Sequence, residues 1–394
     1  MSPSTGTLQA LQTLVGFATV SRDSNLGLIE WVRDRLARQG AVCRLTYDAS
    51  GRKANLFATL GEGARPGLIL SGHTDVVPVD GQDWRSDPFQ ASLRDGRLYG
   101  RGCADMKGFI AVALALAPRV LARAAPDAPV HLALSYDEEI GCVGVRGLIA
   151  DLHEQGLSAA GCIVGEPTGM EPVLGHKGAR TWRCCVRGRE AHSSLASAGV
   201  NAVENAALLI ARLRELAGEL ARNERRHDGF DVPHSTLQAN WIQGGIATNV
   251  VPRDCEFRID LRHLSGTDPE ALLARLQAHA QDTLLPAMRA IAPESEIRFE
   301  ALGEVPAFET APDAPLVARV RRHLGAAADA APRYVGFGSE AGLFQRAGIA
   351  SVLCGPGSIE QAHKPDEFVS LEQLARCERF LESLLELPSA PPGH

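Results

Sequence analysis

Apolar residues follow two different spacings in the first part of the chain. They recur at helical spacing over residues 26–38 and fill most positions of 109–124, which predicts two helices, the second mostly buried. Short apolar runs typical of strands occupy 41–47, 55–60, 68–72, 130–139 and 161–169. Several of these runs end in polar residues. Strands that alternate with helices therefore predict an α/β sheet with its functional site along one edge.

The pattern changes from about residue 178 onward. Strands, helices and strands follow in the order β-α-β-β-α-β over 179–188, 201–220, 235–245, 254–263, 269–284 and 296–302. This order predicts a compact two-layer α+β sandwich. The first pattern then resumes with a helix at 315–324, a strand at 350–355 and a helix at 371–386.

An interrupted catalytic domain is the simplest account of these two patterns. We expect residues 1–178 and 304–394 to form that domain and residues 179–303 to form a smaller inserted domain. The tail 388–394 is rich in proline and is expected to be disordered.

Composition excludes several classes of protein. The formal net charge is −7, so no basic field attracts nucleic acid or an anionic membrane. The nine cysteines are an odd number without a CxxC pair, which favours a reducing compartment and argues against a disulfide framework. No signal peptide is evident, and the longest apolar run, 109–117, is far too short to span a bilayer. We expect a soluble cytoplasmic protein.

Ligand-type side chains stand just beyond apolar strands or beside glycines at five places. These are His73 with Asp75, Asp105, the acidic run 137–139, Glu166 and His363. Taken singly, each has an ordinary structural interpretation: a core histidine satisfied by an aspartate, a helix cap, a solvated strand end or a turn. Together, two histidines and several carboxylates without thiolates suit zinc or a similar divalent ion, whose charge would compensate the buried acids.

Six segments resemble the M20 family of dinuclear zinc aminoacylases and peptidases. They are "SGHTDVVPV", "GRGCADMKG", "SYDEEIGCVG", "VGEPT", "GREAHSS" and "EQAHKPDEF", and they follow the family's order along essentially the whole chain. The resemblance implies a metallo-aminopeptidase-like catalytic domain, with a mixed sheet between helices, and an inserted ferredoxin-like dimerisation domain. It also implies a homodimer with two divalent metal ions per subunit, zinc first and cobalt as the alternative.

Carried onto this sequence, the resemblance also implies the metal ligands. Asp105 would bridge both metals, with a cis peptide bond after it. The remaining ligands would be His73 and Glu166 on one metal, and Glu139 and His363 on the other. Asp75 would bind His73 and fix its tautomer, so that the strand presents a ligand together with the group that orients it.

The resemblance further implies roles around the reacting bond. Glu138 is expected to be the general base, because the side chains of adjacent residues diverge and Glu139 can bind metal while Glu138 faces the attacking water. His192 would reach the partner subunit's active site and donate to the oxyanion. The expected substrate-binding residues are Asn249, Arg262, Lys177 and Glu340, the last facing a cationic side chain. Structural interpretations of Asn249 and Arg262, as a turn residue and a surface residue, are equally open.

The expected reaction is removal of the acetyl group from N2-acetyl-L-ornithine, a step of arginine biosynthesis. The segments "GHKGARTW", "GGIATNVVPRDCEFRIDLR" and "GPGSIEQAHKPDEFV" resemble the branch of the family with that activity. The alternatives are another N-acyl-amino-acid deacylase, such as one acting on N-succinyl-diaminopimelate, and a catalytically inactive metal-binding or interaction protein on the same scaffold. Side-chain discrimination depends on pocket contacts that the sequence does not display.

Overall fold

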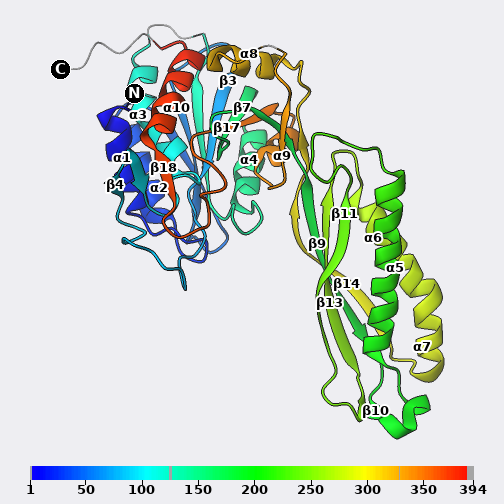
Figure 1. Cartoon of the computed structure of the whole chain (residues 1–394). Coiled ribbons are helices and arrows are strands. Elements are labelled where there is room, and N and C mark those ends of the chain that lie inside the picture. The colour runs from blue at the N-terminus through cyan, green and yellow to red at the C-terminus, as the bar shows by residue number, and fades with distance from the viewer. Residues whose placement is uncertain (1, 124–126, 328, 388–394) are drawn as a thin grey trace. The chain divides into compact units, whose positions relative to one another are not determined.

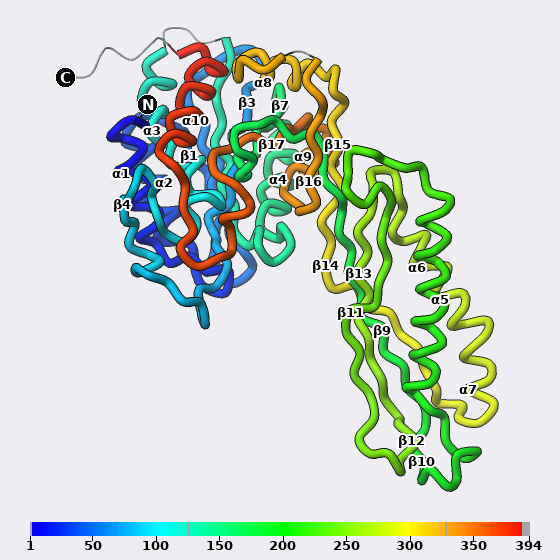
Figure 2. Tube along the Cα trace, in the orientation of Figure 1, coloured from blue at the N-terminus to red at the C-terminus, as the bar shows by residue number. Residues whose placement is uncertain are grey.

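The computed structural model divides the chain into two compact units (Figure 1). It describes residues 2–123, 127–327 and 329–387. Unit 1 comprises Met1–Gly175, Phe308–Tyr334 and Ser339–His394, and unit 2 comprises His176–Ala307 and Val335–Gly338. The chain thus leaves unit 1 after Gly175 to build most of unit 2 and returns at Phe308, as the colour gradient of Figure 2 shows, and it later adds the short segment Val335–Gly338 to unit 2. The expected junctions lie three and four residues from these bounds, and the prediction did not place 335–338 with unit 2.

A nine-stranded mixed sheet forms the centre of unit 1. Its main strand order is β1-β2-β6-β3-β7-β17-β8-β15, and β16 pairs with β8. The strands are β1 (Val42–Tyr47), β2 (Ala54–Leu60), β3 (Gly67–His73), β6 (Val130–Ser135), β7 (Ala159–Pro167), β8 (Val173–His176), β15 (Phe308–Glu309), β16 (Arg333–Val335) and β17 (Ser351–Gly355). The four strands β6, β3, β7 and β17 run parallel to their neighbours in this group, so their carboxyl ends meet at one edge.

Helices cover both faces of this sheet. They are α1 (Thr5–Val15), α2 (Leu26–Ala37), α3 (Lys107–Leu121), α4 (Gly144–Glu154), α8 (Pro315–Leu324), α9 (Ala341–Arg346) and α10 (Leu371–Leu384). Buried side chains of α1, α2, α3, α8 and α10 share one apolar core with alternate residues of the sheet. The helices α4 and α9 contact each other and the sheet, and their buried apolar side chains lie outside that core, on the other face. A small sheet of β18 (Phe368–Ser370), β5 (Arg97–Tyr99) and β4 (Ser92–Arg94) completes unit 1.

Two glycines let the buried helix α3 approach the sheet closely. A Cβ atom at Gly165 of β7 would lie 2.0 Å from the Phe109 ring, and one at Gly72 of β3 would lie 2.9 Å from Ile110. Real side chains never approach so closely, so glycine is required at both places for this packing. The start of α3, and with it Asp105, is thereby brought beside the ends of β3 and β7.

Unit 2 is a four-stranded antiparallel sheet with helices on one face. The sheet order is β11-β13-β9-β14, from β9 (Gly178–Arg187), β11 (Thr236–Gly244), β13 (Asp254–His263) and β14 (Glu296–Val305). Its helices are α5 (Ala202–Asn223), α6 (Pro269–His279) and α7 (Leu285–Ile291). The chain order β9-α5-β11-β13-α6-α7-β14 and this strand order confirm the expected ferredoxin-like topology. A short ladder of β10 (Ala191–His192) and β12 (Val250–Val251) extends from it.

Local sequence explains where the helices of unit 2 begin and change. The side chain of Asn201 caps α5 by accepting from the backbone N–H groups of residues 203 and 204, and Asp268 caps α6 in the same way. The single helix predicted over 269–284 instead changes to π-helical spacing at Ala280–Leu284 before α7 begins. Pro286 follows this turn and cannot donate a backbone hydrogen bond, which interrupts the regular α pattern.

Other sequence predictions have direct outcomes. All nine cysteines are free thiols, as the odd count indicated. Among the described helices, none is both long and apolar enough to cross a membrane. The sequence analysis did not predict α4, although this helix packs on one face of the central sheet. The tail expected to be disordered lies outside the described residues.

Acidification is expected to destabilise unit 1 through His131 of β6. Burial lowers the pKa of His131 to about 4, from an ordinary value of 6.5. The unfolded chain therefore binds a proton below pH 6.5 that the folded chain excludes, so the free energy of unfolding falls as the pH drops from 6.5 towards 4. The loss attributable to this one group approaches about 3 kcal/mol.

Urea unfolding at about pH 7 and about pH 4.5 measures this effect, with His131→Gln as the comparison. The ring of His131 stacks on Phe57 and its Nδ1 lies 3.0 Å from the Thr59 hydroxyl, so the variant also changes stability at neutral pH. The informative quantity is the difference between the two pH values, which should shrink in His131→Gln. Equal differences in the parent and the variant would contradict the prediction.

Candidate functional site

Three parallel strands and the loops that follow them carry most of the predicted metal ligands. His73 is the last residue of β3, and Glu138 and Glu139 follow the neighbouring strand β6. Glu166 lies near the carboxyl end of β7, on the other side of β3. The strand order therefore explains why residues far apart in sequence converge at one sheet edge.

Asp105 reaches this edge from the loop before α3. The peptide bond between Asp105 and Met106 is cis, as the resemblance implied. The Oδ1 atom of Asp105 lies 3.0 Å from His73 Nε2. Its Oδ2 atom lies 3.3 Å from Nε2 of His363, so the two oxygens of one carboxylate face two different histidines.

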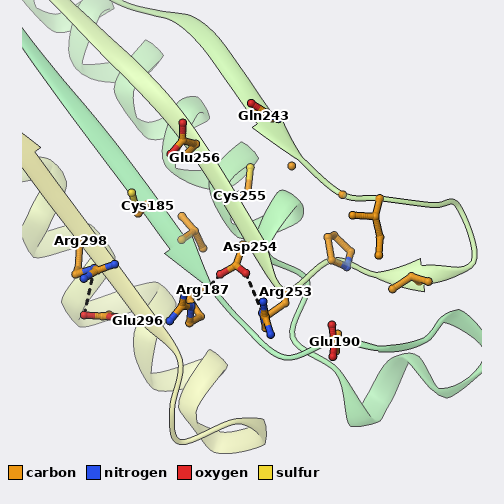
Figure 3. A pocket seen from close by; sticks show the side chains of 16 residues that line it. Cys185, Arg187, Glu190, Gln243, Arg253, Asp254, Cys255, Glu256, Glu296 and Arg298 are labelled. Atoms are coloured by element: carbon orange, nitrogen blue, oxygen red, sulfur yellow. Dashed lines mark hydrogen bonds and ion pairs between the residues drawn. The ribbon is translucent and has the colours of Figure 1, made fainter.

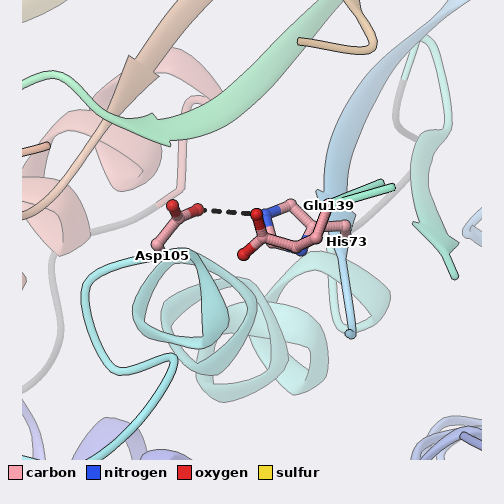
Figure 4. A group of neighbouring side chains, drawn as sticks. All are labelled: His73, Asp105 and Glu139. Atoms are coloured by element: carbon pink, nitrogen blue, oxygen red, sulfur yellow. Dashed lines mark hydrogen bonds and ion pairs between the residues drawn. The ribbon is translucent and has the colours of Figure 1, made fainter. Parts of the chain in front are cut away.

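His73, Asp105 and Glu139 form a cluster in which one ligand atom of each lies within 4.8 Å of the others (Figure 4). His363 joins it on the more open side, with Nε2 at 3.0 Å from a Glu139 carboxylate oxygen. The side chain of His363 is 49% exposed, whereas that of His73 is 1% exposed. The site is thus buried at one end and accessible at the other.

Acidic groups are crowded here to a degree that disfavours their ionisation. Burial raises the pKa of Glu138 and of Glu166 well above the usual range, and nearby carboxylates add to the effect. The pKa of Asp105 is lowered, because hydrogen bonds with His363 and His73 outweigh its burial. Hydrogen bonds with Asp105 and Glu139 raise the pKa of His363 to about 10. A cation placed among these groups would stabilise their ionised forms.

Glu166 provides a separate test of whether a metal fits. Glu166 is 3% exposed, and its Oε1 atom is buried without a hydrogen-bond partner among the described residues. A buried carboxylate oxygen without a partner is costly unless a cation or a donor occupies the space that it faces. The orphaned oxygen, the imidazole nitrogens and the clustered carboxylates are all donors typical of zinc and related ions.

His73 is held in the tautomer that metal binding requires. Its Nδ1 atom lies 2.9 Å from the main-chain carbonyl oxygen of Asp75. A carbonyl only accepts, so Nδ1 carries the hydrogen and the lone pair of Nε2 is left for a cation. The sequence predicted that the Asp75 carboxylate binds His73. In the structure the closest Asp75 carboxylate oxygen is 3.6 Å from His73 Nδ1, which is in ion-pair range and beyond hydrogen-bond length.

The Asp75 carboxylate instead holds the acidic loop after β6. It accepts hydrogen bonds from the backbone N–H groups of Glu138, at 3.1 Å, and Glu139, at 3.3 Å, and from the Ser21 hydroxyl at 2.7 Å. One oxygen of Glu138 lies 3.3 Å from the Cys142 thiol. Asp75 therefore positions the predicted ligand Glu139 and the candidate base Glu138 through their main chain.

Glu340 lies beneath this edge rather than at its surface. It is 1% exposed, and its carboxylate accepts hydrogen bonds from the hydroxyls of Ser71 on β3 and Ser135 on β6. Burial raises the pKa of Glu340 to about 7. This placement argues against the expected contact with the substrate's cationic side chain and for a role in joining the two strands.

The remaining predicted residues belong to unit 2. His192 and Asn249 are exposed, and the Arg262 guanidinium pairs with neighbouring Asp260 at 3.2 Å. Lys177 is 8% exposed, and its Nζ donates to the carbonyl of His234 at 2.6 Å. Lys177 is thus engaged within its own unit.

A hollow on the outer face of the unit 2 sheet contains none of the predicted site residues (Figure 3). Five of its charged side chains pair with one another. Arg187 and Arg253 both contact Asp254, at 2.9 and 2.8 Å, and Arg298 lies 3.4 Å from Glu296. These ion pairs compensate much of the charge that lines the hollow, which makes it a weaker candidate site than the ligand-type cluster of unit 1.

The mixed α/β fold and its edge of histidines and carboxylates define a metal-dependent amidohydrolase. The chain belongs to peptidase family M20/M25/M40, whose sequence profile matches residues 69–387. The match begins at β3 and extends past the last ligand, so it includes all five predicted metal ligands.

Known proteins that resemble the chain agree with this assignment. Acetylornithine deacetylase from Myxococcus xanthus is 37% identical over 388 residues, which cover 97% of each chain. The crystal structure of an M20 family metallo-carboxypeptidase from Sulfolobus solfataricus superposes with a TM-score of 0.74 at 20% identity, covering 98% of this chain and 99% of that one. A dinuclear metal-binding M20 peptidase from Bacillus subtilis gives 0.63 at 16% identity, covering 96% of each. The two structures show the shared fold.

Proposed function

We propose that the protein removes the acetyl group from N2-acetyl-L-ornithine, giving acetate and L-ornithine for arginine biosynthesis. The observation that carries the proposal is 37% identity, over 97% of both chains, to a protein named acetylornithine deacetylase. The donor cluster of His73, Asp105 and Glu139 supplies the metal site that such a hydrolase needs. The same family includes peptidases, so family membership alone does not identify the substrate.

Two metal ions per subunit, zinc in preference to cobalt, are the second part of the proposal. It is supported by the two Asp105 oxygens, which face His73 at 3.0 Å and His363 at 3.3 Å from opposite ends of one carboxylate. Asp105 would bridge the ions, with His73 and Glu166 completing one position and Glu139 and His363 the other. When bound, the ions would polarise the amide carbonyl and acidify the attacking water.

Glu138 is the residue to which we assign proton transfer. Asp75 holds its backbone N–H, and the neighbouring Glu139 side chain contacts His363, so Glu138 is the acid left beside the ligand cluster. It takes a proton from the attacking water and delivers the proton to the leaving amine. In unit 2, Asn249 and Arg262 are proposed to bind the substrate carboxylate, for which a guanidinium provides two parallel donors.

A homodimer formed through unit 2 is also proposed. The strand β11 is the edge of the unit 2 sheet, so one side of its backbone has no partner strand among the described residues. Apolar side chains of this region are exposed: Trp241 by 37%, Ile242 by 50% and Ile246 by 86%. An unpaired edge flanked by exposed apolar residues favours association with another chain.

Amine release from a panel of substrates tests the function. N2-acetyl-L-ornithine is expected to react with a kcat/KM at least about tenfold above those of N-acetylmethionine, N-acetylglutamate and N-succinyl-diaminopimelate. Activity should disappear on chelation and return with added zinc or cobalt. A different preferred substrate with the same metal dependence would support a metal-dependent hydrolase and contradict N2-acetyl-L-ornithine as its substrate. Absence of activity on every member would favour a non-catalytic protein on this scaffold.

A further inference from the structure

We propose that Glu367 is a positioning residue that holds Asp105 and the His363 loop in one arrangement, and thereby sets the affinity of the metal position formed by Asp105, Glu139 and His363. The proposal rests on the two-metal site proposed above. Glu367 is no metal ligand in that scheme, and it follows His363 by only four residues. Its contacts connect two ligand-bearing loops of unit 1.

Both carboxylate oxygens of Glu367 bind the loop that ends in Asp105. Oε1 accepts from the backbone N–H of Ala104 at 2.9 Å and of Asp105 at 3.2 Å. Oε2 accepts from the backbone N–H of Gly102 at 3.0 Å and from the Arg101 guanidinium at 2.8 Å. Four donors therefore converge on one carboxylate that is 1% exposed. The backbone before the bridging ligand is shaped around this side chain.

Arg101 connects the same carboxylate to the His363 loop. Its guanidinium donates to the carbonyl of Lys364 at 3.3 Å and to the side-chain oxygen of Gln82 at 2.5 Å. The amide nitrogen of Gln82 then donates to the main-chain carbonyl of His363 at 2.9 Å. A continuous path of hydrogen bonds thus runs from Asp105 through Glu367, Arg101 and Gln82 to His363. No step of this path uses a ligand atom of either residue.

This path serves one metal position more than the other. His73 is fixed independently, because it ends a central strand and its Nδ1 is held by the Asp75 carbonyl. Among the described residues, none holds the His363 ring in a comparable way, because His363 lies in a loop, has a positive φ of 63° and is half-exposed. Loosening Glu367 should therefore displace the His363 side of Asp105 while the His73 side stays in place.

Metal titration of Glu367→Gln, monitored by competition with a chromophoric chelator, tests the proposal with zinc as the probe. Glutamine keeps one oxygen acceptor but turns the other acceptor into a donor, and in either orientation of the amide this donor faces two donors. We expect the weaker zinc affinity to fall about tenfold or more and the tighter one to change much less. The readout is binding, so it does not depend on turnover.

Glu378→Gln is the matched control. Glu378 is another buried carboxylate of unit 1, 9% exposed, and it accepts from the backbone N–H and hydroxyl of Ser4 and from Thr7. Its loss should lower stability without changing either zinc affinity. If Glu367→Gln does not fold, Gln82→Met removes the link to the His363 carbonyl from a partly exposed position and should weaken the same zinc site to a smaller degree.

The outcomes separate the two proposals. A parent protein that binds only one zinc ion contradicts both the two-metal site and the role of Glu367. A parent that binds two ions, with Glu367→Gln and Gln82→Met binding them equally well, contradicts the role of Glu367 alone. Equal weakening of both sites in Glu367→Gln, matched by Glu378→Gln, would show a general loss of stability and would overturn the selective role.

Discussion

Replacing Glu138 with glutamine is expected to lower kcat by about 10²- to 10⁴-fold while leaving metal content unchanged. Glutamine has nearly the same shape but cannot accept a proton from water. The backbone N–H at this position would still bind Asp75, and the neighbouring Glu139 would still contact His363, so the ligand geometry should persist. The lost activity would then report the proton transfer itself.

The environment of Glu138 suits both halves of that transfer. Burial, the largest influence, raises its pKa well above the usual value of a glutamate, and the neighbouring Glu139 and Glu340 raise it further. Bound cations would offset part of this rise, and to the extent that the pKa of Glu138 stays raised, its carboxylate is a stronger base towards water and, once protonated, a closer match to the leaving amine.

Kinetics and metal analysis of three variants measure this prediction. Glu138→Asp keeps a carboxylate at a shorter reach and should recover part of the activity that Glu138→Gln loses. Glu154→Gln, at the exposed end of α4, is the control for removal of one negative charge from the same unit and should match the parent. Full turnover by Glu138→Gln would refute general-base catalysis by this residue, and a loss of bound metal would reassign it as a ligand.

The fold was accessible from sequence wherever apolar periodicity is strong. The buried strands β3, β6 and β7 and the helix α3 consist almost entirely of apolar residues, so their existence follows from composition alone. The helix α4 is less distinct in sequence, with only four buried residues, and was not recognised. The π-helical turn at Ala280–Leu284 depends on hydrogen-bond spacing that hydrophobic pattern does not encode.

The candidate ligand set could also be named from sequence, because each predicted ligand adjoins a strand end or a glycine-flanked loop. The residues that hold the ligands could not. Glu367 contacts Asp105 across 262 positions of sequence, and no local pattern marks that contact. Asp75 was identified, but its carboxylate binds the backbone of Glu138 and Glu139, a partnership created by the pairing of β3 with β6.

Glu340 illustrates how much sequence context leaves open. Its charge and its glycine-flanked position suggested that it faces the substrate's cationic side chain, and in the structure its carboxylate accepts hydrogen bonds from two serine hydroxyls of adjacent strands. Each serine lies in a largely apolar, buried strand, where its hydroxyl serves a buried acid. Only the register of β3 and β6 reveals that both hydroxyls point to one place.

His192→Ala is expected to lower kcat by about 10²- to 10³-fold, as loss of a donor to a developing oxyanion does. The backbone N–H of Ser194 lies 3.2 Å from His192 Nδ1 and can only donate, so Nδ1 accepts and the ring hydrogen sits on Nε2. The side chain is exposed, so this Nε2–H is free to donate to a bound molecule. Substrate binding should change less than turnover, because the oxyanion exists only in the transition state.

Mixing two inactive variants distinguishes whether His192 acts within its own subunit or on its partner. A His192→Ala subunit retains Glu138, and a Glu138→Gln subunit retains His192. If His192 acts across a dimer, a heterodimer of the two contains one complete active site. Random reassociation makes half of all dimers heterodimers, so an equal mixture should recover about a quarter of the parent activity after subunit exchange.

If each subunit uses its own His192, no site in the mixture is complete and activity stays at the level of the separate variants. That result, or a fully active monomer, would refute the assignment across the dimer while leaving the chemistry of unit 1 intact.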